Sequence, residues 1–539
     1  MYTDKENVNI LTALLVAHGV KHAVVCPGSR NAPIVHNLNE CPDIHCYPIT
    51  DERSAGFYAL GMSQCLRQPV AVCVTSGTAL LNLTPAVAEA YYQQASLVVI
   101  SADRPPQWIN QLDGQTLPQP DALKPFVGKA VSLPECMPHD SLTGKHTADD
   151  THWYCNRLAN EALITQHGPV HINVPISEPL FNFPVAELPR ERQIELIKAD
   201  ATSITVSHVT NMFLQAKKPM LIGGQPMNPN MDEAVWLVGE DERYIPDFVL
   251  YTGGSIVSKR LKHFLRKAKE TWIVNNTGEV TDTFQNATHV IEGDGEVMAD
   301  LLRFHLEQQP HPFIQLWDEL LQKIRKQAMD YEPDYSQMAA IKYFEQHIGA
   351  QHKGAQHKGS DPMCYDPMCY FHYANSTAIR LANIFAHHQV YCNRGVNGIE
   401  GSLSTAAGFS CVTEKNVFCV IGDLSFFYDQ NALWNQNLRG NLRILLLNNG
   451  KGGIFNMLKG LEQSAARDAY IAAAHHTSAE GICQQNQVMY LKAENMSELQ
   501  QGMEILLYSE SLHPVLLEVF TDASVDERTF KEYYRSLHL

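Results

Sequence analysis

The chain has 539 residues, an apolar content of 45% and a formal net charge of −17 at pH 7. This length favours about three domains, and the apolar content allows each of them a sizeable core. The negative charge argues against nucleic acid as a main partner, because a nucleic-acid-binding surface must be basic. The thirteen cysteines show no C-x-x-C pair and no zinc-site spacing, which favours reduced thiols in the cytoplasm.

The N-terminal sequence predicts no targeting segment. Met1–Asn9 is polar and runs into a helical pattern, which is not the pattern of a secretory signal peptide. No stretch approaches the roughly 18 consecutive apolar residues of a membrane-spanning helix. We therefore expect a cytoplasmic protein that does not cross a membrane.

The first part of the chain predicts an open parallel sheet with helices on both faces. Its buried strands are short apolar runs bounded by turn residues, as in sheets that are covered on both sides. A helix is expected at Val8–His18, and strands at His22–Cys26, Val70–Val74, Leu97–Ser101 and Val170–Pro175.

Turns of small and polar residues follow three of these strands. They read P-G-S-R-N-A-P from Pro27, T-S-G-T-A from Thr75 and A-D-R-P-P from Ala102. Ligands bind at the carboxyl ends of strands in such sheets, so these turns are candidate ligand loops. The alternative for the first turn is an ordinary loop with a solvated Arg30.

A further helix is predicted to open at Ile49–Gly56. Thr50 or Asp51 would cap it, which places Glu52 in its first turn. A first-turn glutamate usually only complements the helix dipole.

The middle of the chain predicts another α/β region, over about 190–345. Strands are expected at Pro219–Gly224, Asp247–Gly254 and Thr271–Asn275, and an amphipathic helix at Phe313–Ala328. Two exact tandem duplications follow, A-Q-H-K-G from Ala350 and D-P-M-C-Y from Asp361. Their Pro and Gly residues favour an irregular interdomain loop over a metal site.

Two apolar runs near the C-terminus, Val417–Ile421 and Arg443–Leu447, predict neighbouring parallel strands with a helical stretch between them. Asp423 follows the first strand and Asn449 the second, so one strand-helix-strand unit would bring them together. A carboxylate and an amide oxygen suit Mg2+, which completes its octahedron with water and substrate phosphates. Pro514–Phe520 is the last expected strand, before a polar helical end.

These segments resemble those of known enzymes. The G-D and N-N-G pair is similar to the cofactor signature of thiamine-diphosphate (ThDP) enzymes. The order of P-G-S-R-N-A-P, T-D-E-R-S-A-G, V-T-S-G-T-A and S-A-D-R-P-P resembles one branch, the 2-succinyl-5-enolpyruvyl-6-hydroxy-3-cyclohexene-1-carboxylate synthases. A-N-S-T-A-I-R from Ala374, N-R-G-V-N-G-I-E-G from Asn393 and S-K-R from Ser258 agree with it. The resemblance covers nearly the whole chain and is weakest over 183–245 and 300–370.

The resemblance implies an α/β fold with three doubly wound parallel-sheet domains. Residues 1–185 would bind the cofactor's pyrimidine, 190–345 would form a central domain, and 371–539 would bind the diphosphate. The implied enzyme is a transferase of menaquinone biosynthesis, dependent on ThDP and on Mg2+, which Mn2+ could replace. It decarboxylates 2-oxoglutarate and adds the resulting carbanion 1,4 to isochorismate.

The resemblance also assigns residues to the cofactor. Glu52 would hydrogen-bond the pyrimidine, and Ile399 would support the cofactor from below, although a core isoleucine fits the sequence equally well. Asp423, Asn449 and a backbone carbonyl at Lys451 would hold the cation, although many members of the family have glycine at the last position. The remaining residues implied in cofactor binding are Thr78, Gly422, Leu424, Ser425, Ile454 and Phe455.

Both implied substrates are dianions, and arginine binds carboxylate through paired hydrogen bonds. The predicted substrate-binding residues are Arg30, Arg104, Lys259, Arg260, Ser376, Arg380 and Arg394, and the predicted catalytic residues are Ser29, Arg30, Glu52 and Gln115. Each cation alone would more often be solvated surface, but their shared position in strand-end motifs favours function. The chain departs from the family at Gly114, where members often have asparagine.

In ThDP enzymes, one site combines the glutamate of one chain with the diphosphate-binding domain of another. The resemblance therefore implies a homodimer or homotetramer with sites at the chain interface. Two alternatives remain open, another ThDP-dependent carboligase or decarboxylase and a catalytically silent ThDP-binding protein. A flavin or nucleotide role is disfavoured because no G-x-G-x-x-G opens a helix.

Overall fold

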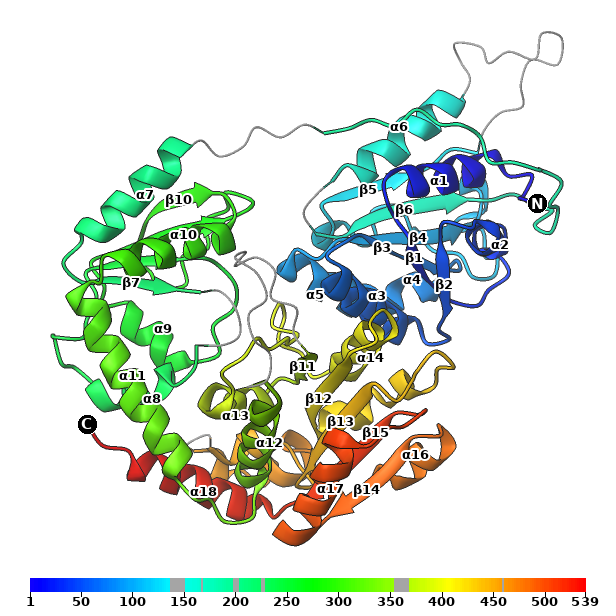
Figure 1. Cartoon of the computed structure of the whole chain (residues 1–539). Coiled ribbons are helices and arrows are strands. Elements are labelled where there is room, and N and C mark those ends of the chain that lie inside the picture. Colours follow the sequence, from blue (N-terminus) through cyan, green and yellow to red (C-terminus); the bar gives the residue numbers. More distant parts are fainter. Residues whose placement is uncertain (136–150, 166–167, 197–202, 224–227, 353–367, 458–459) are drawn as a thin grey trace. The chain divides into compact units, whose positions relative to one another are not determined.

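The structure, a computed structural model, describes residues 1–135, 151–165, 168–196, 203–223, 228–352, 368–457 and 460–539 (Figure 1). Most of the tandem duplications over 350–370 lie outside the described residues. The chain forms two compact units. Unit 1 consists of Met1–Ile197, Gly395–Val417 and Tyr428–Leu442, and unit 2 of Lys198–Arg394, Phe418–Phe427 and Arg443–Leu539.

Unit 1 is built on a six-stranded parallel sheet in the order β2-β1-β3-β4-β6-β5. Its strands are β1 (His22–Val25), β2 (His45–Pro48), β3 (Val70–Val74), β4 (Leu97–Asp103), β5 (Lys129–Ser132) and β6 (Val170–Pro175). Every residue of β3, β4 and β6 is buried, which explains why these strands are the most apolar runs in this part of the chain.

Helices cover both faces of this sheet (Figure 1). One face carries α1 (Glu6–Ala17), α2 (Ala32–Glu40) and α6 (Thr151–Leu163), and the other carries α3 (Glu52–Leu66), α4 (Thr78–Asn82) and α5 (Thr84–Gln93). A further helix, α14 (Ser402–Cys411), packs directly on α3. A Cβ on Gly61 would lie 1.9 Å from the Thr405 carbonyl oxygen, so the close approach of the two helices requires glycine there.

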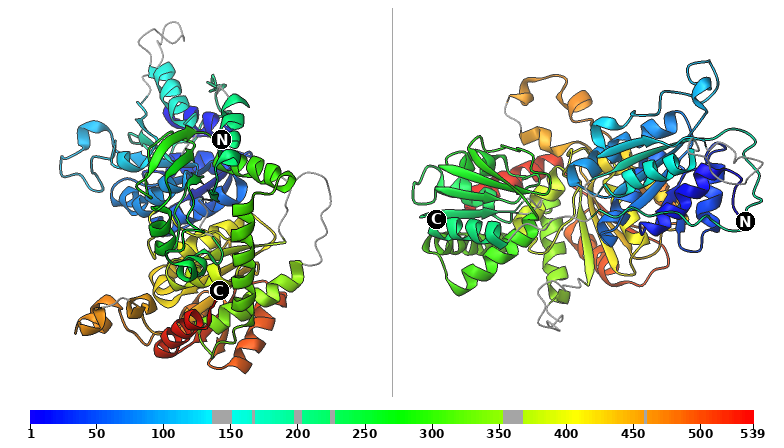
Figure 2. Two further views of the ribbon diagram at one scale, coloured as in Figure 1. Left: turned by 90° about the vertical axis from the view of Figure 1, so that its left-hand side faces the viewer. Right: turned by 90° about the horizontal axis from the view of Figure 1, so that it is seen from above.

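Unit 2 contains a four-stranded parallel sheet in the order β10-β9-β8-β7. Figures 1 and 2 draw this part of the chain in green. The strands are β7 (Pro219–Ile222), β8 (Phe248–Tyr251), β9 (Glu270–Asn275) and β10 (Ala287–Glu292). One face packs on α8 (Met231–Val238), α9 (Lys259–Leu265) and α11 (Pro312–Asp330). The other packs on α7 (Ser203–Gln215) and α10 (Gly295–Gln308).

Unit 2 also contains a five-stranded sheet in the order β11-β12-β13-β15-β14. Its strands are β11 (Cys369–Tyr373), β12 (Asn416–Gly422), β13 (Leu442–Asn448), β14 (Met489–Ala493) and β15 (Val515–Phe520). One face is packed by α12 (Gln337–His352), α13 (Thr377–Phe385), α17 (Met496–Tyr508) and α18 (Ala523–Ser536).

The remaining helices are short. The helical stretch expected between β12 and β13 consists of α15 (Asp423–Tyr428) and a single 3-10 turn, η3 (Gln430–Leu433). The others are α16 (Glu480–Gln485), the 3-10 turns η1 (Pro106–Trp108), η2 (Lys124–Phe126), η4 (Gly453–Met457) and η5 (Leu461–Gln463), and the π-helical turn η6 (Arg467–Ile471).

Three parallel sheets flanked by helices confirm the predicted α/β class. The division of the chain into three domains stays a prediction. Among the residues the structure describes, no helix is both long enough and apolar enough to cross a membrane.

Candidate active site

The P-G-S-R turn lies at a switch point of the six-stranded sheet. From β1 the chain proceeds to β2 on one side, and β3 is added on the other side. Ligands bind at such points because the loops diverge and leave a crevice. A Cβ on Gly28 would lie 2.3 Å from the Thr75 Cβ, so glycine lets the β1 turn lie against the β3 turn. Ser29 is exposed on this turn.

Two arginines concentrate positive charge near this turn. Arg30 is only 5% exposed, donates to the Ile176 carbonyl oxygen at 2.9 Å and pairs with Glu178 at 3.2 Å. Arg104 pairs with Asp113 at 3.0 Å. Burial, followed by the positive charge of Arg104, lowers the pKa of Arg30. Two neighbouring guanidinium groups, one of them buried, suit a carboxylate ligand.

Gln119 ties together the turns that surround these arginines. It is fully buried, and its Oε1 accepts from the Gly77 backbone N–H at 2.7 Å. Its Nε2 donates to the Ala102 carbonyl oxygen at 3.0 Å and to Asn173 Oδ1 at 2.9 Å. The exposed Gln115 lies four residues earlier, in a left-handed conformation with φ of 54°. Gln119 therefore fixes the loop that presents Gln115.

Glu52 is the first residue of α3 and is half-buried. The capping residue is Asp51, whose side chain accepts from the backbone N–H groups of Arg53 and Ser54 at 2.9 and 3.4 Å. Glu52 Oε2 accepts from Asn82 Nδ2 at 3.1 Å. The cap and this contact hold the carboxylate at the start of the helix, where a ligand can reach it.

In unit 2, Asp423 and Asn449 lie together at the ends of β12 and β13. Asp423 is 4% exposed, and its Oδ1 accepts from the Leu424 backbone N–H at 2.7 Å. Its Oδ2 accepts from the backbone N–H groups of Asn449 and Gly450 at 3.2 and 2.8 Å. The sequence therefore predicted correctly that these two residues are neighbours.

The oxygen atoms at this edge fit a hard cation. The Asp423 carboxylate, the Asn449 amide oxygen and the Lys451 backbone carbonyl are the ligand types that Mg2+ prefers. The described residues contain no cluster of three or more His, Cys, Asp or Glu that could hold a metal. A cation here would depend on water or phosphate for its other ligands, as Mg2+ commonly does.

His475 is a neighbour of this edge that the sequence did not reveal. Its Nε2 lies 3.4 Å from Asp423 Oδ2, and this interaction raises the pKa of His475. Its backbone N–H donates to the Gly450 carbonyl oxygen at 2.7 Å, and Gly452 N–H donates to the Ala472 carbonyl oxygen at 2.7 Å. These two bonds close the loop from Gly450 to His475 beside the candidate cation site.

Basic residues also gather within unit 2. Arg394 donates to Asn375 Oδ1 at 3.0 Å, next to Ser376. Burial lowers the pKa of Lys262, and the positive charges of Arg394 and Lys259 lower it further. The charges of Arg394 and Lys259 both act on Lys262, so positive charge is concentrated around this side chain and would attract anions. Lys262 was not predicted from the sequence.

Two of the predicted arginines differ in their surroundings. Arg260 forms an ion pair with Asp232 and lies over the Tyr534 ring, 4.9 Å from its centroid. Arg380 has no hydrogen-bond or ion-pair partner among the described residues. Arg380 is therefore the better placed to receive a ligand, and a substrate role for either residue stays a prediction.

Comparison with known proteins identifies the family of the chain. A family model described as the N-terminal TPP (thiamine pyrophosphate) binding domain of thiamine pyrophosphate enzymes matches residues 6–123. A 2-succinyl-5-enolpyruvyl-6-hydroxy-3-cyclohexene-1-carboxylate synthase of Bacteroides fragilis is 43% identical, with 100% of both chains covered. The chain belongs to this synthase family.

Other members and one solved structure agree with this placement. The synthases of Bacteroides thetaiotaomicron and Porphyromonas gingivalis are 42% and 31% identical, over 100% and 99% of this chain and 100% and 97% of theirs. Benzoylformate decarboxylase from Polynucleobacter necessarius superposes with a TM-score of 0.67 at 16% identity, over 97% of this chain and 99% of that one. At that identity the superposition shows the fold alone.

Ile399, which the synthase resemblance places under the cofactor, is 42% exposed and is therefore not the core isoleucine of the alternative interpretation. Its turn is held within unit 1 by Glu89, which accepts from the backbone N–H groups of Gly395 and Val396 at 2.6 and 2.7 Å. A Cβ on Gly395 would lie 2.8 Å from the Glu89 carbonyl oxygen, so this turn requires glycine.

The other predicted cofactor residues lie at or after the carboxyl ends of β3 in unit 1 and of β12 and β13 in unit 2. Ser425 is buried, Thr78 is exposed, and the half-buried ones are Gly422, Leu424, Ile454 and Phe455. Lys451, where the chain departs from the family, has its Nζ 3.6 Å from Asp468 Oδ1. Its side chain therefore has a partner of its own beside the edge.

Proposed function

We propose that this synthase decarboxylates 2-oxoglutarate and adds the resulting carbanion 1,4 to isochorismate, as a step of menaquinone biosynthesis. Membership of the family makes the chain a ThDP-dependent synthase. One observation supports this reaction over other ThDP-dependent reactions. The chain is 43% identical to one of these synthases over its whole length, and it also has Glu52 and the Asp423–Asn449 edge.

When bound, ThDP supplies the electron sink that stabilises a carbanion. Glu52 would hydrogen-bond the pyrimidine ring and exchange a proton with it. Its support is the Asp51 cap and the contact with Asn82, which hold the carboxylate at the first turn of α3. A positioned acid-base group of this kind contributes about 100-fold to 10,000-fold to a reaction rate.

The proposed cation is Mg2+, which Mn2+ could replace. Asp423 and Asn449 would bind it through side-chain oxygens, and Lys451 through its backbone carbonyl. The support is the set of hard oxygen atoms and the adjacency of Asp423 to the backbone of Asn449 and Gly450. Replacing Asp423 with alanine should remove one ligand and weaken Mg2+-dependent ThDP binding.

Both proposed substrates carry two carboxylates, and each unit by itself offers cations that would bind such groups. Arg30 and Arg104 supply positive charge in unit 1, and Lys259, Lys262 and Arg394 supply it in unit 2. Ser29, Gln115, Ser376 and Arg380 would add polar contacts. A carboligase that uses an uncharged second substrate needs fewer cations, which favours the proposed pair over it.

We also propose a homodimer, or a tetramer of two such dimers, with the sites shared between chains, as in other ThDP enzymes. The cytoplasm is the proposed location, and its support is that the described cysteines are all thiols without disulfides. Sedimentation at several protein concentrations tests the assembly, since a monomer active at the lowest concentration would contradict it.

A donor-choice experiment tests the proposed function. The purified protein with ThDP and Mg2+ is supplied with isochorismate and either 2-oxoglutarate or pyruvate, with the Glu52→Gln variant as control. We expect consumption of 2-oxoglutarate alone, and at least a 100-fold loss in the variant while ThDP stays bound. Consumption of pyruvate would indicate a different carboligase. Bound ThDP without consumption of either acid would indicate a silent binder.

A further inference from the structure

The proposed cation site requires Asn449 to present its amide oxygen. The two ends of an asparagine amide have nearly the same shape, but only the oxygen can bind a cation. A rotated amide would direct two N–H groups at the cation. Something in the structure must therefore fix this rotation.

Asp526 on α18 contacts the other end of the Asn449 amide. Its Oδ2 accepts from Asn449 Nδ2 at 3.0 Å and from the Thr521 hydroxyl at 2.8 Å. Its Oδ1 accepts from the Gln337 backbone N–H at 2.8 Å. The Gln337 N–H and the Thr521 hydroxyl both donate to this carboxylate, so it acts as an acceptor and the amide group facing it is the NH2. Asn449 Oδ1 is thereby directed away from Asp526, where it also accepts a long hydrogen bond of 3.4 Å from the Lys451 backbone N–H.

We propose that Asp526 is a positioning residue of the cation site and that it selects the amide rotation in which Asn449 Oδ1 faces the cation. The inference rests on the cation site proposed above. Partners that orient a metal ligand typically change metal affinity about 10-fold to 100-fold when removed. The three hydrogen bonds that Asp526 accepts leave its own carboxylate little freedom to rotate.

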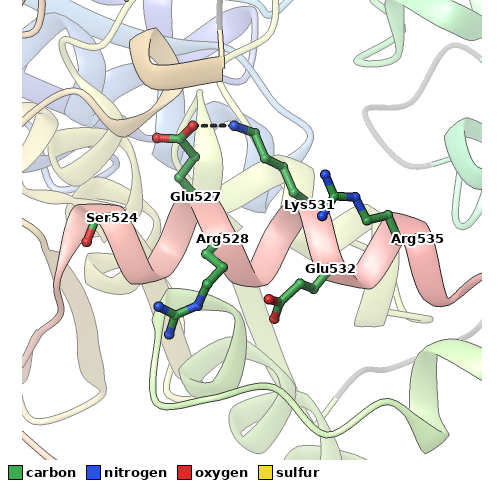
Figure 3. Close-up of a pocket in the computed structure, with 6 residues that line it drawn as sticks. All are labelled: Ser524, Glu527, Arg528, Lys531, Glu532 and Arg535. Atoms are coloured by element: carbon green, nitrogen blue, oxygen red, sulfur yellow. Dashed lines mark hydrogen bonds and ion pairs between the residues drawn. The ribbon is translucent and has the colours of Figure 1, made fainter.

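The rest of α18 provides controls. Figure 3 shows a charged surface of this helix, where Glu527 and Lys531 form an ion pair one turn apart. A hollow lined by such side chains is a solvated helix face, and none of them contacts Asn449. Asp522 caps the same helix by accepting from the backbone N–H groups of Ser524 and Val525 at 2.7 and 3.2 Å. Asp522→Ala therefore disturbs α18 without touching the amide.

The test measures the Mg2+ concentration that gives half-maximal ThDP binding, by equilibrium dialysis, for the full-length protein and its variants. We expect Asp526→Ala to raise this Mg2+ concentration about 10-fold or more, and Asp522→Ala to leave the Mg2+ concentration unchanged. Asp526→Asn should also raise it. In this variant the new amide oxygen would still accept from the Gln337 N–H. The new amide NH2 group would then face the NH2 group of Asn449, so that two donors meet.

An exchange of the two side chains separates orientation from simple support of the fold. Asn449→Asp combined with Asp526→Asn restores one donor and one acceptor and still offers an oxygen to the cation. We expect the Mg2+ concentration for half-maximal ThDP binding of this double variant to lie within about 3-fold of that of the unmodified protein. This difference is well below the 10-fold effect of a lost partner.

Three results would count against the inference. Unchanged Mg2+ dependence in both single variants of Asp526 would overturn it, and so would a double variant as weak as Asp526→Asn alone. If the unmodified protein bound ThDP equally well without Mg2+, the proposed cation site would fail and this inference with it. That outcome is recognised in the unmodified protein, before any variant is compared.

Discussion

Two strand-to-helix turns, one in each unit, have nearly the same backbone conformation but different residues. Gly77 lies between β3 and α4 with φ of 90° and ψ of −141°. Ser376 lies between β11 and α13 with φ of 74° and ψ of −127°. Each comes three residues after its strand and directly before its helix. Only glycine adopts this conformation without strain.

The surroundings explain why the first turn requires glycine. A Cβ on Gly77 would lie 3.2 Å from the Gln115 Cα and 3.3 Å from the Gln115 carbonyl oxygen. The second turn accommodates a side chain but strains the backbone, at a cost of about 1–3 kcal/mol. Strain of this kind gathers at functional sites. The first turn therefore needs glycine so that Gln115 can lie close to it, whereas the second turn carries the Ser376 hydroxyl at a cost in backbone strain.

The largest effect is expected from making the first turn resemble the second. Gly77→Ser should lower the free energy of unfolding by about 2–4 kcal/mol, since it combines backbone strain with a contact against Gln115. Turnover should fall as the Gln115 loop is displaced. Chemical denaturation and steady-state kinetics measure the two losses.

Gly114→Ser is the matched control, because a Cβ on Gly114 would meet no atom within 4 Å. Equal stability of the two serine variants would contradict the explanation that crowding requires glycine in the first turn.

The second-largest effect is expected from removing Arg394, the side chain that contacts the second turn. Arg394 donates to Asn375, the residue before Ser376, at 3.0 Å. Arg394→Ala should slow isochorismate consumption about 100-fold, because a charged hydrogen bond is worth about 1.5–3 kcal/mol. Release of carbon dioxide from 2-oxoglutarate should fall much less.

Both steps are followed in a single turnover, in which carbon dioxide release precedes isochorismate consumption, and Arg243→Ala serves as control since Arg243 pairs with Asp241 on an exposed surface. Equal losses in the two rates would mean that Arg394 does not act on the isochorismate step in particular.

A smaller effect is expected when the hydroxyl of the second turn is removed. Ser376→Ala keeps the strained backbone but loses one hydrogen-bonding group, so kcat/KM should fall about 10-fold, or about 1.4 kcal/mol. The free energy of unfolding should change by less than about 0.5 kcal/mol. Unaltered kcat/KM would show that the Ser376 hydroxyl does not contribute to the reaction.

The smallest effect is expected from making the second turn resemble the first. Ser376→Gly should relieve the strain and raise the free energy of unfolding by about 0.5–1 kcal/mol, after the extra freedom of glycine in the unfolded chain is subtracted. Thermal and chemical unfolding measure it. A less stable glycine variant would show that the serine stabilises the turn through its contacts.

The sequence predicts those parts of the fold whose signals are local. β3 and β6 have their predicted bounds because their apolar runs are buried on both sides. The edge strands β2 and β5 were missed, since H-C-Y-P and K-A-V-S are partly exposed and carry no apolar run. Asp423 and Asn449 were found because each directly follows a buried strand.

The supporting residues could not be predicted in the same way. Asp526 lies 77 positions from Asn449, and Gln119 lies 42 positions from Gly77. Neither belongs to a motif, and their roles follow from packing that no local pattern encodes. The surroundings of Arg260 could not be foreseen for the same reason, because Asp232 and Tyr534 come from separate helices.

Whether decarboxylation and addition occur together on this protein is tested by following isochorismate loss and carbon dioxide release in one reaction. The purified protein is supplied with ThDP, Mg2+, 2-oxoglutarate and isochorismate, with omission of ThDP as the control. We predict a one-to-one ratio of the two quantities that depends on ThDP. Carbon dioxide release that does not depend on isochorismate, or isochorismate loss without carbon dioxide release, would contradict the proposed synthase reaction.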